Sequence, residues 1–307
     1  MAVEQVEQLA IPETIAREHA GGAEPRPPGA WERARRLPIG PAAVLVVFVS
    51  VALFGPWLAP LDPEQPDLLA RLTPPAWAGG SPAHLLGTDR LGRDVLSRMI
   101  VGARPSFVVA LVTIGVGGGL GVALGLTAGY LGGRIDVLIM RFADSAISFP
   151  LILLALLLTA AIGPGIATVV VAISLLLWAR LARLIRAQVL SIKQRDFVAL
   201  ARVAGVPWWR VILVHVLPNV LNTVVVLLTL DLGLVIGVEA TLSFLGAGIP
   251  PPTPTWGQMV ADGRAYVATA WWLSLFPGLA IALVVLSFNL LGDWLRDFLD
   301  PRLRAAR

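Results

Sequence analysis

The chain has 307 residues, of which 56% are hydrophobic and only 14% are charged. Soluble domains carry about 25% charged residues, so this composition excludes an ordinary soluble enzyme and indicates a protein with several membrane spans. The formal net charge is +4, and in so apolar a chain basic loops at a membrane surface explain that excess better than nucleic-acid binding does. There is no cysteine, which excludes disulfides and thiolate metal sites.

Residues 1–36 are polar, rich in Glu, Pro and Gly, and contain no apolar run. We therefore expect a disordered N-terminal tail on the cytoplasmic side rather than a signal peptide. Two further regions follow. Residues 37–104 should hold the first span and an external loop with an amphipathic helix, and residues 105–307 a five-helix core interrupted by a charged loop at about 193–218.

Uncharged stretches predict an all-α membrane protein with six spans, because a bilayer needs about 20 mostly apolar residues per helix. Between charged residues lie 25 residues at 37–61, 29 at 105–133 and 35 at 145–179, the last divided by Gly163-Pro164-Gly165 into a hairpin of two spans. Residues 219–241 and 265–292 supply the fifth and sixth spans. With six spans, 18 of the 24 basic residues fall on the side of both termini, 131–141 and 180–210, which predicts cytoplasmic termini.

The segment Gly87–Arg98 before the second span carries Asp89 with Arg93 and Asp94 with Arg98 at i,i+4 spacing. This spacing predicts a short helix at the membrane surface, with Thr88 or Asp89 as its N-cap. Within the second span, Gly117, Gly121, Gly125 and Gly129 form a stripe at which helices approach closely. Static packing inside one subunit is favoured here over an interface that slides during transport.

Arg180, Arg183 and Arg186 form a second stripe, at i,i+3 spacing after the fourth span. They are suited to contact an acidic partner or, as the favoured interpretation, lipid headgroups. The following segment reads as a helix, a turn at Gly205 and a second helix that closes in Leu217-Pro218. Phe197, Leu200 or Ala201, and Ala204 share one face of the first helix, which an amphipathic surface helix would explain equally well.

Asp231 and Glu239 lie within the fifth span, where an ionisable side chain normally faces a cavity or a partner. Eight residues place them about 12 Å apart along a helix, so they are not one paired carboxylate site. A translocation path or a subunit interface is favoured over a proton relay. In the next external loop, Trp256 and Arg264 follow a proline-rich run. They are candidates for docking a binding protein, or they belong to an ordinary turn-forming loop without that role.

These segments together resemble the C-type permeases of bacterial ABC importers for dipeptides, oligopeptides and nickel. The resemblance rests on Gly87–Arg104, on Glu239–Gly246, on the tail Phe288–Arg302 and on the charged loop, and it extends from about residue 37 to the C-terminus. It implies the type I importer fold and a multi-pass protein of the bacterial inner membrane. It also implies a second homologous permease, two cytoplasmic ATPases and an extracytoplasmic solute-binding protein, with dipeptides or oligopeptides as cargo.

The charged loop resembles the coupling loop on which the ATPases of this family dock. The implied coupling residues are Phe197, Ala199, Leu200, Ala201, Arg202, Gly205, Leu217 and Pro218. The loop departs from the family pattern because the family's glutamate aligns with Ala199 and its first alanine with Leu200. This departure puts the usual salt bridge to the ATPase in doubt, although not the docking shape.

No catalytic, cofactor or metal site is expected in this chain. The only lysine, Lys193, is followed by Gln194, so the Gly-Lys-Ser/Thr of a phosphate-binding loop is absent and ATP hydrolysis belongs to partner subunits. The three histidines lie far apart in sequence, which argues against a metal site. Three alternatives stay open: a permease for nickel or another small solute, a self-sufficient proton-coupled carrier that uses Asp231 and Glu239, and a membrane scaffold that transports nothing.

Overall fold

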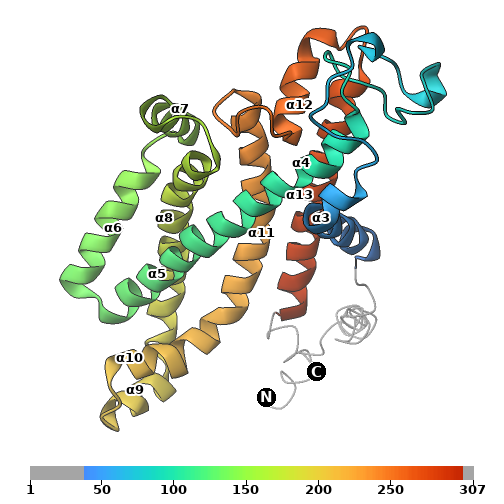
Figure 1. Ribbon diagram of the computed structural model, residues 1–307. Coiled ribbons are helices and arrows are strands. Elements are labelled where there is room, and N and C mark those ends of the chain that lie inside the picture. The colour runs from blue at the N-terminus through green and yellow to red at the C-terminus, as the bar shows by residue number, and fades with distance from the viewer. Residues whose placement is uncertain (1–37, 300–307) are drawn as a thin grey trace, which may run out of the picture. The chain divides into compact units, whose positions relative to one another are not determined.

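The computed structural model describes residues 38–299, and the regular structure of this range is helical apart from one isolated bridge between Thr88 and Asp94. Five continuous helices in it are long and apolar enough to cross a membrane. In chain order the first and last are α3 (Ile39–Leu58) and α13 (Trp272–Leu299), and α8 (Ile166–Ile192) is the third (Figure 1). The expected tail at 1–36 lies outside the described residues.

The other two long helices each contain a π-helical turn. The first joins α4 (Val95–Thr113) through Ile114–Gly118 to α5 (Gly119–Leu131). The second joins the short α10 (Trp208–Arg210) through Val211–Val216 to α11 (Leu217–Phe244). The predicted boundary between residues 104 and 105 therefore falls inside α4. The second helix of the charged loop was expected to close at Leu217-Pro218, but it runs on into the fifth span, because Pro218 lies in the first turn of α11 just after a π turn.

A bent helix pair stands where the sequence predicted a loop and one straight span. Helix α6 (Gly133–Ile147) and helix α7 (Leu151–Ile162) meet at an angle of 84°. Residues 131–141 are thus mostly helical rather than a loop, because α5 ends at Gly132, which has a positive φ, and a helix restarts one residue later. Pro150 forces the second break, since the residue before a proline avoids the helical region. With this pair counted as one span, the total reaches the predicted six.

The glycine stripe packs α5 against α8, as the sequence analysis favoured. A Cβ atom on Gly121 would lie 2.7 Å from the Trp178 carbonyl oxygen, and one on Gly125 would lie 2.7 Å from the carbonyl oxygen of Ala182. Such distances are closer than contact, so only glycine permits these two backbones to approach. Gly129 meets the side chain of Val189 in the same way. The stripe is therefore an internal packing surface.

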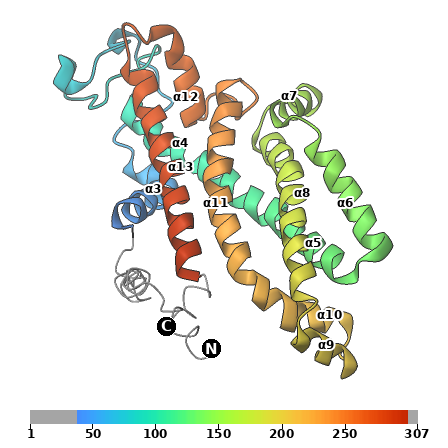
Figure 2. The same cartoon turned by 180° about the vertical axis from the view of Figure 1, so that it is seen from behind.

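Two groups of shorter elements lie at opposite ends of the long helices. One end carries α10 and the helix α9 (Asp196–Val203), and the other carries α12 (Trp256–Gly263) and the connecting segment 59–94 (Figures 1 and 2). Separate apolar clusters support them. Val198, Ala201 and Val211 join one cluster near α9, while Trp256 and Trp272 belong to the other. The two ends are therefore distinct platforms joined by the long helices.

Candidate functional site

The tip formed by α9 and α10 is closed by a tight turn at Gly205. This residue has φ +73°, and its backbone N–H donates to the carbonyl of Arg202 at 3.0 Å. The N–H of Val206 donates to the carbonyl of Ala201 at 3.1 Å. Both bonds together form the Schellman motif, which caps the end of a helix through a residue in the left-handed region. The predicted left-handed turn at Gly205 is thereby confirmed.

The tip presents apolar side chains outward. Val203 is 88% exposed and Leu200 is 68% exposed, while Trp208 and Trp209 are also well exposed. The inward face of α9 consists instead of Val198 and Ala201, with Phe197 packed beside them. Of the residues expected to share one face of this helix, Phe197 and Ala201 pack inward, whereas Leu200 and Ala204 are exposed. Exposed apolar residues on a rigid, capped turn are typical of a protein docking surface.

The remaining predicted coupling residues are placed as follows. Ala199 and Arg202 are exposed on α9, whereas Leu217 and Pro218 are the first two residues of α11. The Arg202 guanidinium lies 5.3 Å from the centre of the Tyr130 ring and donates to the carbonyl of Lys193 at 3.3 Å. The Lys193 ammonium lies 5.6 Å from the same ring. Arg202 therefore fastens the tip to the end of α5, a contact with Tyr130 that the sequence did not reveal.

The arginine stripe of α8 is paired within the chain. Arg180 forms an ion pair with Asp231, Arg183 with Asp144, and Arg186 with Asp136. These pairs are closer to the acidic-partner interpretation than to the favoured one of lipid headgroups, and the acidic partners lie in the same chain. The reason is tertiary, because α6 supplies two of the aspartates and α11 supplies the third, on helices that flank α8.

Asp231 and Glu239 occupy different environments on α11, as their spacing predicted. The Asp231 side chain is 3% exposed, and its oxygen Oδ2 has no hydrogen-bond partner in the described part of the chain. Glu239 is completely enclosed by the chain and accepts hydrogen bonds from Ser106 of α4 and Ser243 of α11, both at 2.7 Å. An unpaired charge at the centre of a membrane helix costs roughly 2.5–3.5 kcal/mol, so both carboxylates need these partners.

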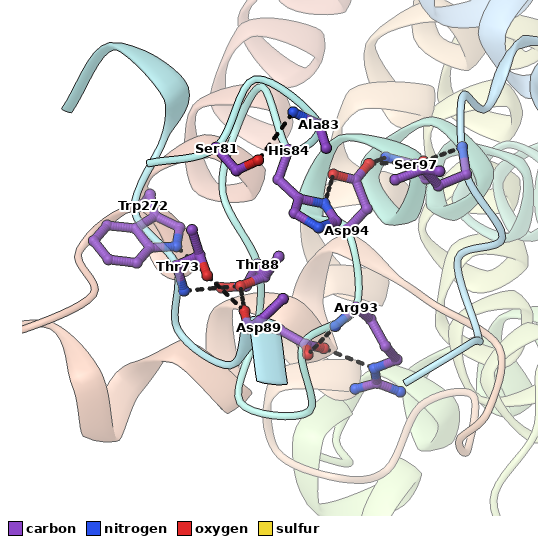
Figure 3. A network of polar contacts seen from close by, with 12 residues as sticks. Thr73, Ser81, Ala83, His84, Thr88, Asp89, Arg93, Asp94, Ser97 and Trp272 are labelled. Carbon is purple, nitrogen blue, oxygen red and sulfur yellow. Dashed lines mark hydrogen bonds and ion pairs between the residues drawn. The ribbon is translucent and has the colours of Figure 1, made fainter. Parts of the chain in front are cut away.

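The segment before α4 is held by a buried polar network (Figure 3). The Asp89 carboxylate accepts from the Arg93 side chain at 2.7 Å and from the backbone N–H groups of Leu91 and Arg93. Asp89 is also 3.7 Å from the Arg98 guanidinium, whose Nη1 donates to the carbonyl of Pro63 at 3.0 Å. The short surface helix expected here is absent, because Asp89 folds these backbone donors into a turn.

Asp94 is the N-cap of α4, whereas Thr88 or Asp89 was expected to cap the short surface helix that is absent here. Its carboxylate accepts from the backbone and the hydroxyl of Ser97, at 2.8 and 2.7 Å, and lies 3.1 Å from His84 Nδ1 (Figure 3). The predicted pair of Asp94 with Arg98 does not form. The indole N–H of Trp272 in α13 donates a hydrogen bond to the Thr88 carbonyl at 3.2 Å, which holds this segment against α13.

The two candidate docking residues at this end differ in exposure. Trp256 is only 5% exposed, because its indole packs 5.5 Å from the Phe48 ring and donates to the carbonyl of Met99 at 2.8 Å. The expectation of an exposed tryptophan is therefore wrong. Arg264 is exposed and lies 5.7 Å from the Phe244 ring.

Comparison with known proteins places these features in one family. Residues 121–305 match the family described as binding-protein-dependent transport system inner membrane component, and residues 33–75 match the N-terminal transmembrane domain of oligopeptide transport permease C. The chain belongs to this permease family. A di/tripeptide transport system permease protein of Pseudomonas aeruginosa is 44% identical over 87% of this chain and 89% of its own length. A dipeptide transport system permease protein of Escherichia coli is 46% identical over 85% of this chain and 87% of its own length.

The permease also shares its fold with a solved transporter. An inward-facing structure of the MetNI methionine ABC transporter aligns with a TM-score of 0.51, covering 69% of this chain and 96% of that chain at 18% sequence identity. At this identity the likeness shows the fold alone. It agrees with the predicted all-α type I importer fold, while the family match supports a multi-pass protein of the inner membrane.

Sequence reasoning missed three side chains outside the motifs that make contacts at the candidate site. Asp136 and Asp144 hold α6 against α8, and Tyr130 holds Arg202. The sequence offered one signal for the two ion pairs: Asp136 and Asp144 precede the evenly spaced series Arg180, Arg183 and Arg186. That signal needed the antiparallel arrangement of α6 and α8 before it could be interpreted.

Proposed function

We propose that this permease forms, with a second homologous permease, the translocation path for dipeptides or oligopeptides. Two cytoplasmic ATPases drive it, and an extracytoplasmic binding protein delivers the cargo. The peptide cargo is supported by the names of the relatives, which are 40–46% identical and cover most of the chain. The likeness to a methionine transporter supports the fold and leaves the cargo to those relatives.

One observation carries the coupling role. Val203, Leu200, Trp208 and Trp209 are exposed apolar side chains on a capped turn between two membrane helices. Such a surface stays rigid when pushed, because the Schellman motif, the Tyr130 contact and the buried cluster below it all restrain it. Ala199 replaces the acidic residue of the family loop, so docking here relies on apolar contact and shape rather than on that salt bridge.

The two ends of the long helices face opposite sides of the membrane in this proposed role. The tip and both termini face the cytoplasm, and the end with Arg264 faces the binding protein. Asp231 and Glu239 support the translocation path from within this subunit rather than through direct contact of Glu239 with a partner, since Glu239 is enclosed. We expect no cofactor in this chain and place ATP hydrolysis in the partner subunits.

The first experiment tests the coupling surface. Val203→Asp places a charge at the most exposed apolar position of the tip, and we expect at least a tenfold loss of ATPase co-purification and a matching loss of dipeptide uptake. Leu69→Asp is the matched control, because Leu69 is 100% exposed at the opposite end of the helices. Normal ATPase recovery and normal uptake in the Val203→Asp variant would exclude the tip as the docking surface.

A second experiment tests the cargo. Uptake of labelled dipeptides and of nickel is compared in cells with and without the gene, with the partner subunits present. We expect dipeptide uptake to require the gene, and nickel uptake to be the same with and without it. The reverse result would favour a permease for nickel. Uptake that persists without any ATPase would favour the proton-coupled carrier.

A further inference from the structure

Arg180 and Asp231 form an asymmetric ion pair in the middle of two membrane helices. Arg180 is the fifteenth of the 27 residues of α8, and Asp231 is the fifteenth of the 28 residues of α11. The Asp231 side chain is 3% exposed, but the Arg180 side chain is 46% exposed. The carboxylate is therefore inside the helix packing, while nearly half of the Arg180 side chain remains exposed.

The exposed part of Arg180 belongs to a defined face of α8. Leu184 and Ala187, four and seven residues later, are exposed on the same side. The opposite side carries Leu181 and Ile185, both fully buried against the glycine stripe of α5. No described element of this chain covers the face with Arg180, which therefore meets lipid, another subunit or water.

Lipid is the least favourable of these neighbours. A charged side chain within a span almost always faces a bundle interior or a water-filled cavity. Arginine escapes to headgroups by extending along the helix, but here the ion pair holds the guanidinium beside the middle of α11. The face of α8 that carries Arg180 is thus better suited to an aqueous space than to the bilayer.

The hydrogen-bonding groups that the Arg180–Asp231 pair leaves unused indicate which solute groups this aqueous space would bind. A guanidinium has five N–H donors in a fixed fork, and a single aspartate occupies only part of them. Asp231 also retains Oδ2 without a hydrogen-bond partner among the described residues. A free guanidinium edge recognises carboxylates with strong, charge-assisted hydrogen bonds.

We propose that the α8 face formed by Arg180, Leu184 and Ala187 lines the translocation path, and that Arg180 binds carboxylate groups of the passing solute. The inference rests on the proposed function and adds a residue that influences which solutes pass. Asp231 acts as a positioning residue, because it holds the guanidinium at the surface of the path. Anionic peptides then gain more from Arg180 than cationic peptides do.

The solute test compares two dipeptides in the complete transporter. Uptake of labelled Ala-Glu and Ala-Lys is measured for the wild type and for Arg180→Gln, and the ratio of the two rates is compared between the proteins. The binding protein is the same throughout, so its own selectivity cancels. We expect Arg180→Gln to lower the Ala-Glu to Ala-Lys ratio by roughly tenfold, since one hydrogen bond to a charged group is lost. Arg180→Lys should retain most of the ratio.

Two further variants separate recognition from folding. Arg180→Gln leaves Asp231 buried and unpaired, so Arg180→Gln with Asp231→Asn removes both charges and should restore assembly while the ratio stays low. Arg183→Gln is the matched control, because Arg183 lies one turn along α8 and is paired with the exposed Asp144. An unchanged ratio in the double variant, or an equal change in Arg183→Gln, would overturn the inference.

The path itself is tested by labelling, which is simple because the chain has no cysteine. A cysteine at Leu184 or Ala187 should react with a positively charged, membrane-impermeant thiosulfonate in the assembled transporter. A cysteine at Val46 or Val47, on the exposed side of α3, should stay unreactive in the bilayer. Unreactive positions 184 and 187 would mean that lipid or the second subunit covers this face. If the wild type imports no peptide, the proposed function fails; if it does and only these tests fail, the inference alone is wrong.

Discussion

Gly205 shows how one residue sets the shape of the tip formed by α9 and α10. Its φ of +73° lies in the left-handed region, where a residue with a Cβ atom is strained by roughly 1–2 kcal/mol. No heavy atom lies within 4 Å of the place where a Cβ would stand, so strain rather than crowding would be the cost of substitution. The backbone conformation alone makes glycine the suitable residue here.

Replacing Gly205 with valine should therefore distort the turn while the membrane helices still form. We expect normal membrane insertion, with several-fold lower ATPase co-purification and dipeptide uptake. Ala204→Val is the control, because Ala204 is exposed and has a φ of −70°, which valine tolerates. If both variants bind the ATPases as well as the wild type does, the capped turn is not required for docking.

At the scale of elements, close packing of α5 on α8 connects the tip to the membrane region. The glycines of α5 bring its backbone against α8, and Arg186 pairs with Asp136 near the end of the same contact. Helix α8 leads directly towards α9, so in the proposed coupling role a rigid α5–α8 pair would transmit motion from the tip. In a membrane such an interface depends on van der Waals contact, which small residues make possible.

Gly125→Ala should disrupt this contact by adding one methyl group. The new Cβ would lie 2.7 Å from the Ala182 carbonyl oxygen and 2.9 Å from Ile185 Cβ, so the helices must separate, at a cost of about 1–3 kcal/mol. Gly119→Ala is the matched control on the same helix, because nothing lies within 4 Å of its Cβ position. Thermal unfolding in detergent, followed by tryptophan fluorescence, should show a lower Tm for Gly125→Ala only. Equal Tm values would show that α5 and α8 adapt without loss.

At the scale of the whole molecule, the two ends of the helices carry different chemistry. One end has an exposed apolar tip, while the other has segment 59–94 fixed by the buried carboxylates Asp89 and Asp94. A transporter that receives energy on one side and solute on the other needs such a division. The excess of arginine on the side of the tip predicts which end faces the cytoplasm.

Cysteine labelling of intact cells tests this orientation. A cysteine at Leu69 should react with a membrane-impermeant maleimide from outside, whereas one at Val203 should react only after the membrane is opened; both residues are highly exposed. A cysteine at Ala52, which is 1% exposed, reports nonspecific labelling and should not react. The reverse pattern would place the tip outside the cell and separate it from any cytoplasmic ATPase.

Much of the fold and part of the candidate site could be predicted from the sequence. The first, second and sixth spans were located because uncharged runs of bilayer length are visible in a linear chain, and Gly205 was identified because a left-handed turn has a residue preference. The bent pair α6 and α7 was missed, since hydropathy does not show that Gly132 ends one helix and Pro150 begins another. The expected short helix and its cap were wrong, because the Asp89 carboxylate accepts from the backbone of Leu91 and Arg93 in a turn, and the helix begins only after Asp94.

The sequence by itself determined the membrane class, the helical architecture, the family and the turn at Gly205, because each depends on composition or on residues close together in the chain. Only the tertiary structure decided that Arg180 pairs with Asp231, that Glu239 meets Ser106, and that Trp256 is buried. These partners are separated by tens of residues or more. Which charge meets which is decided by how the helices pack, and a charge inside a membrane takes whatever partner that packing supplies.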